Sequence, residues 1–171
     1  MGNTMTVSRR PRKSRKWGIA LPLATAVWMG LDLAGPSGAT SAEWIVADPN
    51  SGLAISGFDP VAYFTDGAPL QGKGEFEQAF AGAVWRFSNE GNRAAFNADP
   101  EVYMPRFGGY DPVGLARGVA VAGNPRLWLL DEEHLYLFYT AETRQEFIND
   151  RDRVLTTAGS EWPRLQQKLT P

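Results

Sequence analysis

The 171-residue chain has no cysteine and a single histidine, His134. Without cysteine the protein has no disulfide bond, no thiolate metal ligand and no thiol nucleophile. One histidine excludes a histidine-rich zinc or copper site within one copy of the chain. The sequence also lacks a phosphate-binding loop, a dinucleotide fingerprint, an HExxH motif and a GxSxG elbow. What is present, 43% hydrophobic and 21% charged residues, is the composition of an ordinary globular domain.

The charge is distributed unevenly. The first 42 residues carry six basic residues and one acid, whereas the remainder carries 11 basic and 18 acidic residues, so the net charges are +5 and −7. The acidic remainder predicts no nucleic-acid partner, because it repels a phosphate backbone.

The segment 1–42 has the order of a secretory signal. Its basic residues precede an apolar run, Trp17–Leu31, and small residues then continue to Ala42. We expect cleavage after Ala39 or Ala42 and a periplasmic, extracytoplasmic location. An uncleaved inner-membrane anchor is the alternative, although the 15-residue run is shorter than the roughly 20 residues that a membrane-spanning helix needs.

An internal repeat organises the remainder, with copies at 57–103 and 109–154. The block GFDPVA (57–62) recurs 52 residues later as GYDPVG (109–114). Five further residues recur 51 positions later, and these are Trp85, Phe87, Arg93, Phe96 and Asp99, matched by Tyr136, Phe138, Arg144, Phe147 and Asp150. Two copies are too few for a solenoid, so the repeat predicts two similar units packed on each other.

Each unit has the same predicted plan. An Asp-Pro pair predicts a short helix, because Asp accepts hydrogen bonds from free backbone N–H groups and Pro suits the first helical position. A β-hairpin follows in each unit, pairing 75–80 with 84–88 and 127–130 with 135–139. A helix then follows each hairpin, the first capped by Ser88 or Asn89 and ending near Asp99-Pro100, the second capped by Thr140.

The predicted fold class is therefore α+β: two similar units of short helical turn, β-hairpin and helix, packed as one small domain. We expect a linker over 43–54, the domain over 55–166 and a tail over 167–171. The predicted core consists of Trp85, Phe87, Phe96, Leu129, Leu137, Phe138 and Phe147.

Four segments together resemble the YHS domain-containing proteins of bacterial envelopes. They are GFDPVAYF (57–64), the stretch WRFSNEGNRAAFNADPEVYMPRFGGY (85–110), LYLFY (135–139) and SEWPRL (160–165). The resemblance implies a small exported domain from a family linked to heavy-metal contexts. Related domains carry cysteines where Ser88 and Asn92 stand here, and the envelope branch carries one where Asp111 stands. This chain therefore lacks the thiolates on which a soft-metal role would rest.

The candidate ligand-binding residues are Asp59, Tyr63, Arg106, Gly108, Gly109, Tyr110 and Asp111. The Gly-Gly pair permits unusual backbone angles and close approach of a ligand. Weaker candidates for a metal ligand are His134, in an acidic turn, and Met104, a thioether. Each of these residues also has a purely structural interpretation, as a turn, a cap or part of the core.

We therefore expect an exported, non-enzymatic YHS-type binding module without a cofactor or a metal. Its partner would be a small ligand or an envelope protein, bound near Tyr63, Tyr110 and Asp111 where the units meet. One alternative is a structural or interaction protein anchored in the membrane. A second is a hydrolase-like enzyme that uses Asp59 and Asp111 as paired carboxylates.

Overall fold

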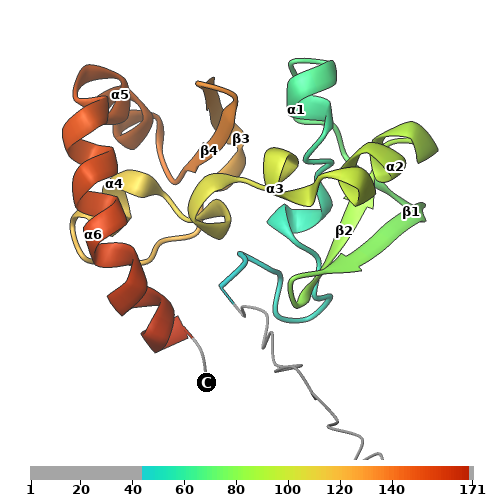
Figure 1. Ribbon diagram of the computed structural model, residues 1–171, viewed down its shortest axis with the longest axis horizontal. Coiled ribbons are helices and arrows are strands. Elements are labelled where there is room, and N and C mark those ends of the chain that lie inside the picture. Colours follow the sequence, from blue (N-terminus) through green and yellow to red (C-terminus); the bar gives the residue numbers. More distant parts are fainter. Residues whose placement is uncertain (1–43, 170–171) are drawn as a thin grey trace, which may run out of the picture. The chain divides into compact units, whose positions relative to one another are not determined.

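The structure is a computed structural model that describes residues 44–169. The predicted export signal lies outside the described residues. Within the described part, the chain forms two consecutive units, which we call the first unit (55–103) and the second unit (106–169). Figure 1 shows the order and arrangement of their helices and strands.

The first unit opens with a short left-handed turn and closes with a short helix. Its elements are η1 (Ile55–Gly57), α1 (Ala62–Thr65), β1 (Lys73–Phe80), β2 (Ala83–Phe87), α2 (Glu90–Ala98) and α3 (Pro100–Tyr103). Asn89 caps α2 by accepting a hydrogen bond from the backbone N–H of Asn92.

The second unit repeats this order and ends in a longer helix. Its elements are η2 (Arg106–Gly109), α4 (Pro112–Ala116), β3 (Asn124–Asp131), β4 (His134–Phe138), α5 (Ala141–Asn149) and α6 (Arg151–Leu169). Thr140 caps α5 in a capping box with Thr143.

The two hairpins match in register and in their irregularities. Each is an antiparallel pair that stands alone as a two-stranded sheet. Each first strand is interrupted near its start, between Lys73 and Glu77 in β1 and between Asn124 and Trp128 in β3, positions that are 51 residues apart. Both two-residue turns have positive φ angles, at 81–82 and at 132–133, as a type I′ turn requires.

The predicted α+β class with two similar units is confirmed, and both predicted helix caps are in place. The chain differs from the prediction at its C-terminal end, where α6 extends to Leu169 through the expected tail. This helix contains Pro163 and buries Val154, Ala158 and Leu165. Packing of that buried stripe against α4 outweighs the weak helix propensity of its Thr, Gly and Pro residues.

Side chains from both units share the core. The main cluster consists of Ile45 and Ala54, residues from the first unit, and Leu135 and Leu137 of β4. Six of the seven predicted core residues are buried, whereas Leu129 is only partly buried and packs against a second cluster around Phe147. No helix within residues 44–169 has the length and apolar character needed to cross a membrane.

Candidate functional site

Asp59 is completely buried and accepts hydrogen bonds through both carboxylate oxygens. Its Oδ1 atom accepts from the backbone N–H groups of Val61 (2.9 Å) and Ala62 (3.3 Å) at the start of α1. Its Oδ2 atom accepts from the N–H and hydroxyl of Ser88 (2.7 and 2.8 Å) and from the side-chain amide of Asn92 (2.7 Å). The carboxylate therefore joins the start of α1 to the end of the hairpin and to α2.

Asp111 has the same role in the second unit. It is also completely buried, and its Oδ1 caps α4 through the N–H groups of Val113 (2.8 Å) and Gly114 (3.4 Å). Its Oδ2 accepts from the N–H of Tyr139 (2.9 Å) and the hydroxyl of Thr143 (2.6 Å). Because both carboxylates are buried and hydrogen-bonded on both oxygens, neither presents a free face to a substrate. Ser88 and Asn92, which stand where related domains carry thiols, are donors to Asp59 here.

The Gly108-Gly109 pair makes a left-handed turn that accommodates the N-terminal end of the described chain. Both glycines have positive φ, 64° and 91°, and both are buried. A Cβ at Gly108 would lie 2.2 Å from the carbonyl oxygen of Trp44, and the Gly108 carbonyl accepts a hydrogen bond from the N–H of Val46. The equivalent turn in the first unit, at Ile55–Gly57, also has positive φ throughout. The pair thus serves close backbone packing.

Tyr63 ties the two units together. Its buried hydroxyl donates a hydrogen bond to the carbonyl of Pro125 (2.9 Å), and its ring stands edge-on to that of Trp128 (5.3 Å between centroids). Burial, followed by the nearby charge of Asp59, raises the pKa of the Tyr63 phenol far above its usual value. The hydroxyl therefore remains protonated and acts as a donor at every physiological pH.

A cavity of about 500 Å³ has mainly apolar walls, and we call it the apolar slot. Its lining residues are Trp44, Phe80, Ala81, Glu101, Met104, Pro105, Arg106, Phe107 and Trp162. Trp162 is the centre of its aromatic packing and also contacts Tyr110 (5.7 Å between centroids). Burial raises the pKa of Tyr110.

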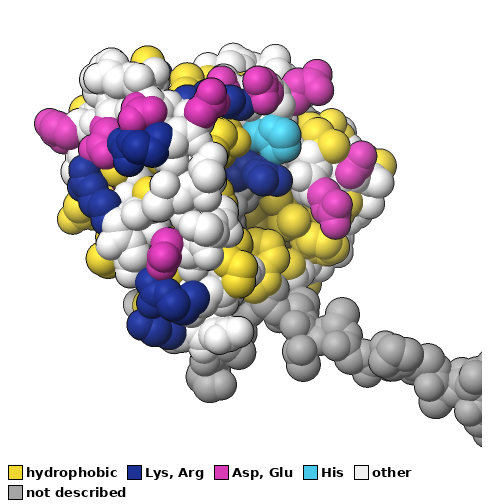
Figure 2. Space-filling model, turned by 60° about the vertical axis from the view of Figure 1, so that its left-hand side comes forward, with side chains coloured by type: hydrophobic (Ala, Val, Ile, Leu, Met, Phe, Trp, Pro, Cys, Tyr) yellow, Lys and Arg dark blue, Asp and Glu magenta, His cyan; other side chains and the backbone are white. Residues whose placement is uncertain are grey.

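His134 is exposed at the start of β4, and its Nδ1 lies 2.7 Å from the carbonyl oxygen of Glu132. It lines a shallow cavity of about 590 Å³ together with Arg106, Glu132 and Glu133. Figure 2 shows the histidine among basic and acidic side chains, with a hydrophobic hollow below it. Within residues 44–169, no group of three or more His, Asp and Glu side chains is arranged to hold a metal ion.

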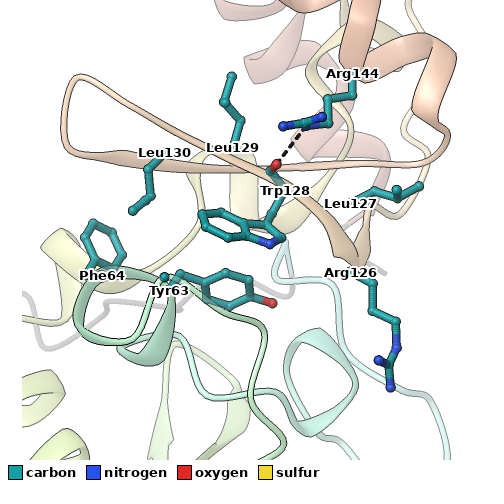
Figure 3. Close-up of a pocket in the computed structure, with 9 residues that line it drawn as sticks. Tyr63, Phe64, Arg126, Leu127, Trp128, Leu129, Leu130 and Arg144 are labelled. Atoms are coloured by element: carbon teal, nitrogen blue, oxygen red, sulfur yellow. Dashed lines mark hydrogen bonds between the residues drawn. The ribbon is translucent and has the colours of Figure 1, made fainter.

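A third cavity, of about 620 Å³, lies between α1 and β3, and we call it the α1–β3 groove (Figure 3). Its lining residues are Tyr63, Phe64, Gly67, Arg126, Leu127, Trp128, Leu129, Leu130 and Arg144. The indole of Trp128 lies over the ring of Tyr63, and Phe64 lies below Leu130. Phe64, Trp128 and Leu130 are only partly buried, so their apolar surface is accessible to a ligand.

The charged side chains of the groove are all basic. Arg126 is exposed, with its guanidinium carbon 5.2 Å from the centroid of the Phe58 ring. Arg144 donates from Nε to the carbonyl oxygen of Trp128 (2.9 Å). No Asp or Glu lines the groove, and no carboxylate among residues 44–169 forms an ion pair with either arginine. The groove therefore combines an aromatic and aliphatic wall with two guanidinium groups that have no acidic partner within the described part of the chain.

The structure distributes the predicted site residues instead of gathering them. Tyr63 borders the α1–β3 groove, Met104 and Arg106 line the apolar slot, and His134 and Arg106 line the shallow cavity. The remaining five line none of these three cavities, and they are Asp59, Gly108, Gly109, Tyr110 and Asp111.

Phe64, Arg126, Trp128, Leu130 and Arg144 were not among the predicted site residues. One signal in the sequence points to two of them, Trp128 and Leu130. The strand segment 127–130 is apolar at four consecutive positions, whereas a hairpin with one solvated face alternates apolar and polar residues. Such a run requires cover on both faces.

Comparison of the chain with protein families, with curated proteins and with solved structures finds no match.

Proposed function

We propose that this chain is an extracytoplasmic, non-enzymatic binding module of the YHS type, whose ligand occupies the α1–β3 groove. The observation that carries the proposal is the composition of that groove, in which Trp128, Phe64 and Leu130 face a cavity bordered by Arg126 and Arg144. Ligand sites typically combine apolar walls with a few polar groups that fix orientation. A ligand with an apolar or aromatic body and an anionic group suits these walls.

The internal repeat supports a specialised role for this groove. The residue equivalent to Trp128 in the first unit is Glu77, which forms an ion pair with Arg86 (2.7 Å). The residue equivalent to Arg144 is Arg93, which pairs with Glu90 (2.8 Å). In the first unit both positions are therefore charged and paired with an opposite charge. In the second unit one is the aromatic Trp128, and the other is Arg144, which has no ion-pair partner among residues 44–169.

The state of the acidic residues favours binding over catalysis. Acid–base catalysis requires a carboxylate within hydrogen-bond reach of a substrate. Asp59 and Asp111 are buried and accept hydrogen bonds on both carboxylate oxygens, and His134 is exposed at the start of β4, where its Nδ1 lies beside the carbonyl oxygen of Glu132. This arrangement gives no support to a hydrolase that uses Asp59 and Asp111.

A binding screen with matched variants tests the proposal. The purified protein is titrated with a panel of small periplasmic anions, aromatic carboxylates and metal ions. We expect at least one anionic apolar ligand to bind with a Kd below millimolar, and Trp128→Ala to weaken it about tenfold or more. The equivalent replacement in the first unit, Glu77→Ala, is the control and should leave binding unchanged. Absence of any binder, or equal loss in both variants, would overturn the proposal.

The extracytoplasmic location is tested by the N-terminus of the protein in cells. The basic, apolar and small-residue order of 1–42 supports export. We expect the mature protein to begin at Thr40 or Glu43, in the periplasmic fraction. An intact chain in the membrane fraction would favour the anchored alternative.

A further inference from the structure

The outer edge of β3 has backbone groups without a strand partner in residues 44–169. Asp131 and His134 close a two-residue turn, so they form a hydrogen-bonded pair, and pairs alternate along an antiparallel ladder. Leu130 and Trp128 therefore occupy non-hydrogen-bonded positions, with N–H and C=O groups directed away from β4. The Arg144 bond to the carbonyl of Trp128 agrees with this direction. β3 pairs only with β4 in the described part of the chain.

The α1–β3 groove runs along this edge. Alternate residues of a strand point to opposite faces of the hairpin. Trp128 and Leu130 pack against the main core cluster, whereas Leu127 and Leu129 pack against the second cluster. All four nevertheless line the same cavity. Side chains on opposite faces of a hairpin can line one cavity only if it runs along the edge of the strand.

This edge lacks the protection that exposed edges normally have. Proteins usually guard a free edge with charged residues, prolines or bulges. In β3 the irregularity and Pro125 lie at the start of the strand, and the stretch from Leu127 to Leu130 is apolar. The equivalent stretch of β1 is Phe76–Ala79, with Glu77 and Gln78 at its centre. The same edge is thus polar in the first unit and apolar in the second.

The charge of the groove identifies the occupant. Arg126 and Arg144 border the edge without a carboxylate partner in residues 44–169, and no acid lines the groove. The basic segment 1–42 of this chain would be repelled. An extended peptide that carries carboxylate side chains matches both the backbone groups and the arginines.

We propose that the edge of β3 receives an extended segment of a partner protein, with apolar and acidic residues in alternation, as an added strand. The added strand bonds to Leu130 and to the N–H of Trp128, while its apolar side chains lie on Trp128 and Phe64. Its carboxylates lie on the opposite face of the added strand, toward Arg144 of α5. This inference rests on the proposed function and specifies the chemical class of the ligand.

The test uses libraries of acetylated, amidated octapeptides on the full-length protein. In the acidic library every second residue is Asp or Glu. In the Lys library the same positions hold Lys. The methylated library repeats the acidic library with alternate backbone nitrogens methylated. Hydrogen exchange is the readout. We expect the acidic library to slow exchange of the Trp128 and Leu130 amides about tenfold or more, and the other two to have little effect. Arg144→Gln should weaken the acidic effect, whereas the equivalent Arg93→Gln should not.

Each outcome separates strand addition from groove binding. If the methylated library protects the Trp128 and Leu130 amides as well as the acidic library does, the partner does not bind as an added strand. If the Lys library protects them equally well, the partner segment is not required to be acidic. If no library protects the edge while a small anion still binds in the Trp128-dependent screen, this inference fails and the proposed function stands. If neither binds, both fail. If protection of these amides grows with protein concentration in the absence of peptide, a second copy of this chain occupies the edge. That result would overturn the proposal of a partner protein.

Discussion

Replacing Asp59 by alanine removes an acceptor on which three elements depend. The side chain accepts five hydrogen bonds, two from the start of α1 and three from Ser88 and Asn92. Alanine leaves these donors facing a small cavity without an acceptor. The end of the hairpin and the start of α2 then lose their link to α1.

The expected loss of stability follows from the number and burial of these donors. Loss of a helix cap costs about 0.5–2 kcal/mol, and each buried donor left unpaired costs about 1–3 kcal/mol. Ser88 is partly buried, so water reaches some of its donors, and removal of a buried carboxylate returns part of the desolvation cost. We expect Asp59→Ala to reduce the free energy of unfolding by about 4 kcal/mol, a large share of the roughly 5–15 kcal/mol of a typical domain. Asp59→Asn keeps Oδ1 as the cap acceptor and should lose about 2 kcal/mol.

Urea denaturation, followed by far-ultraviolet circular dichroism and tryptophan fluorescence, measures both variants. Asp111→Ala is the internal comparison, because Asp111 accepts four bonds of the same kind, and its loss should agree with that of Asp59→Ala within about 1.5 kcal/mol. A loss below about 1 kcal/mol for either alanine variant would refute the structural role of these carboxylates.

Two further predictions concern packing and the contact between the units. Gly123→Ala should lower the free energy of unfolding by more than about 2 kcal/mol, because the new Cβ would lie 2.6 Å from Cβ of Leu137. Gly159→Ala in α6 has open space around it and should raise the free energy of unfolding by about 0.5–1 kcal/mol. Equal shifts of the melting temperature in the two variants would contradict this prediction. Tyr63→Phe should cost about 1–2 kcal/mol by leaving the carbonyl of Pro125 unpaired, and an unchanged urea midpoint would show that this bond does not hold the units together.

Local sequence signals were sufficient for most of the fold. Asn89, Asp111 and Thr140 act over a few residues, so their capping roles can be predicted from the sequence, and all three caps are present in the structure. Asp59 accepts from the N–H groups of Val61 and Ala62 as expected, although Val61 is the N-cap residue of α1. Helix α6 was not predicted, because it is stabilised by packing against α4, and these two segments are distant in the sequence. Leu129 was expected in the core, but it is only partly buried and lines the α1–β3 groove.

The candidate site was much harder to predict. Motif residues such as Asp59, Gly109 and Asp111 stand out in the sequence because the fold constrains them, and the structure uses them for caps and for a tight turn. The groove instead arises where α1 meets the edge of β3. Its walls come from residues about 60 positions apart, and the tertiary contacts of Tyr63 with Pro125 and Trp128 bring them together.

The most direct test of a ligand site in the α1–β3 groove is an NMR titration of the amide-labelled protein with the tightest binder from the screen. We predict that the shift changes concentrate on Phe64, on the strand segment 126–130, including the indole N–H of Trp128, and on Arg144. Changes centred instead on Met104 and Trp162 would place the ligand in the apolar slot and contradict the assignment.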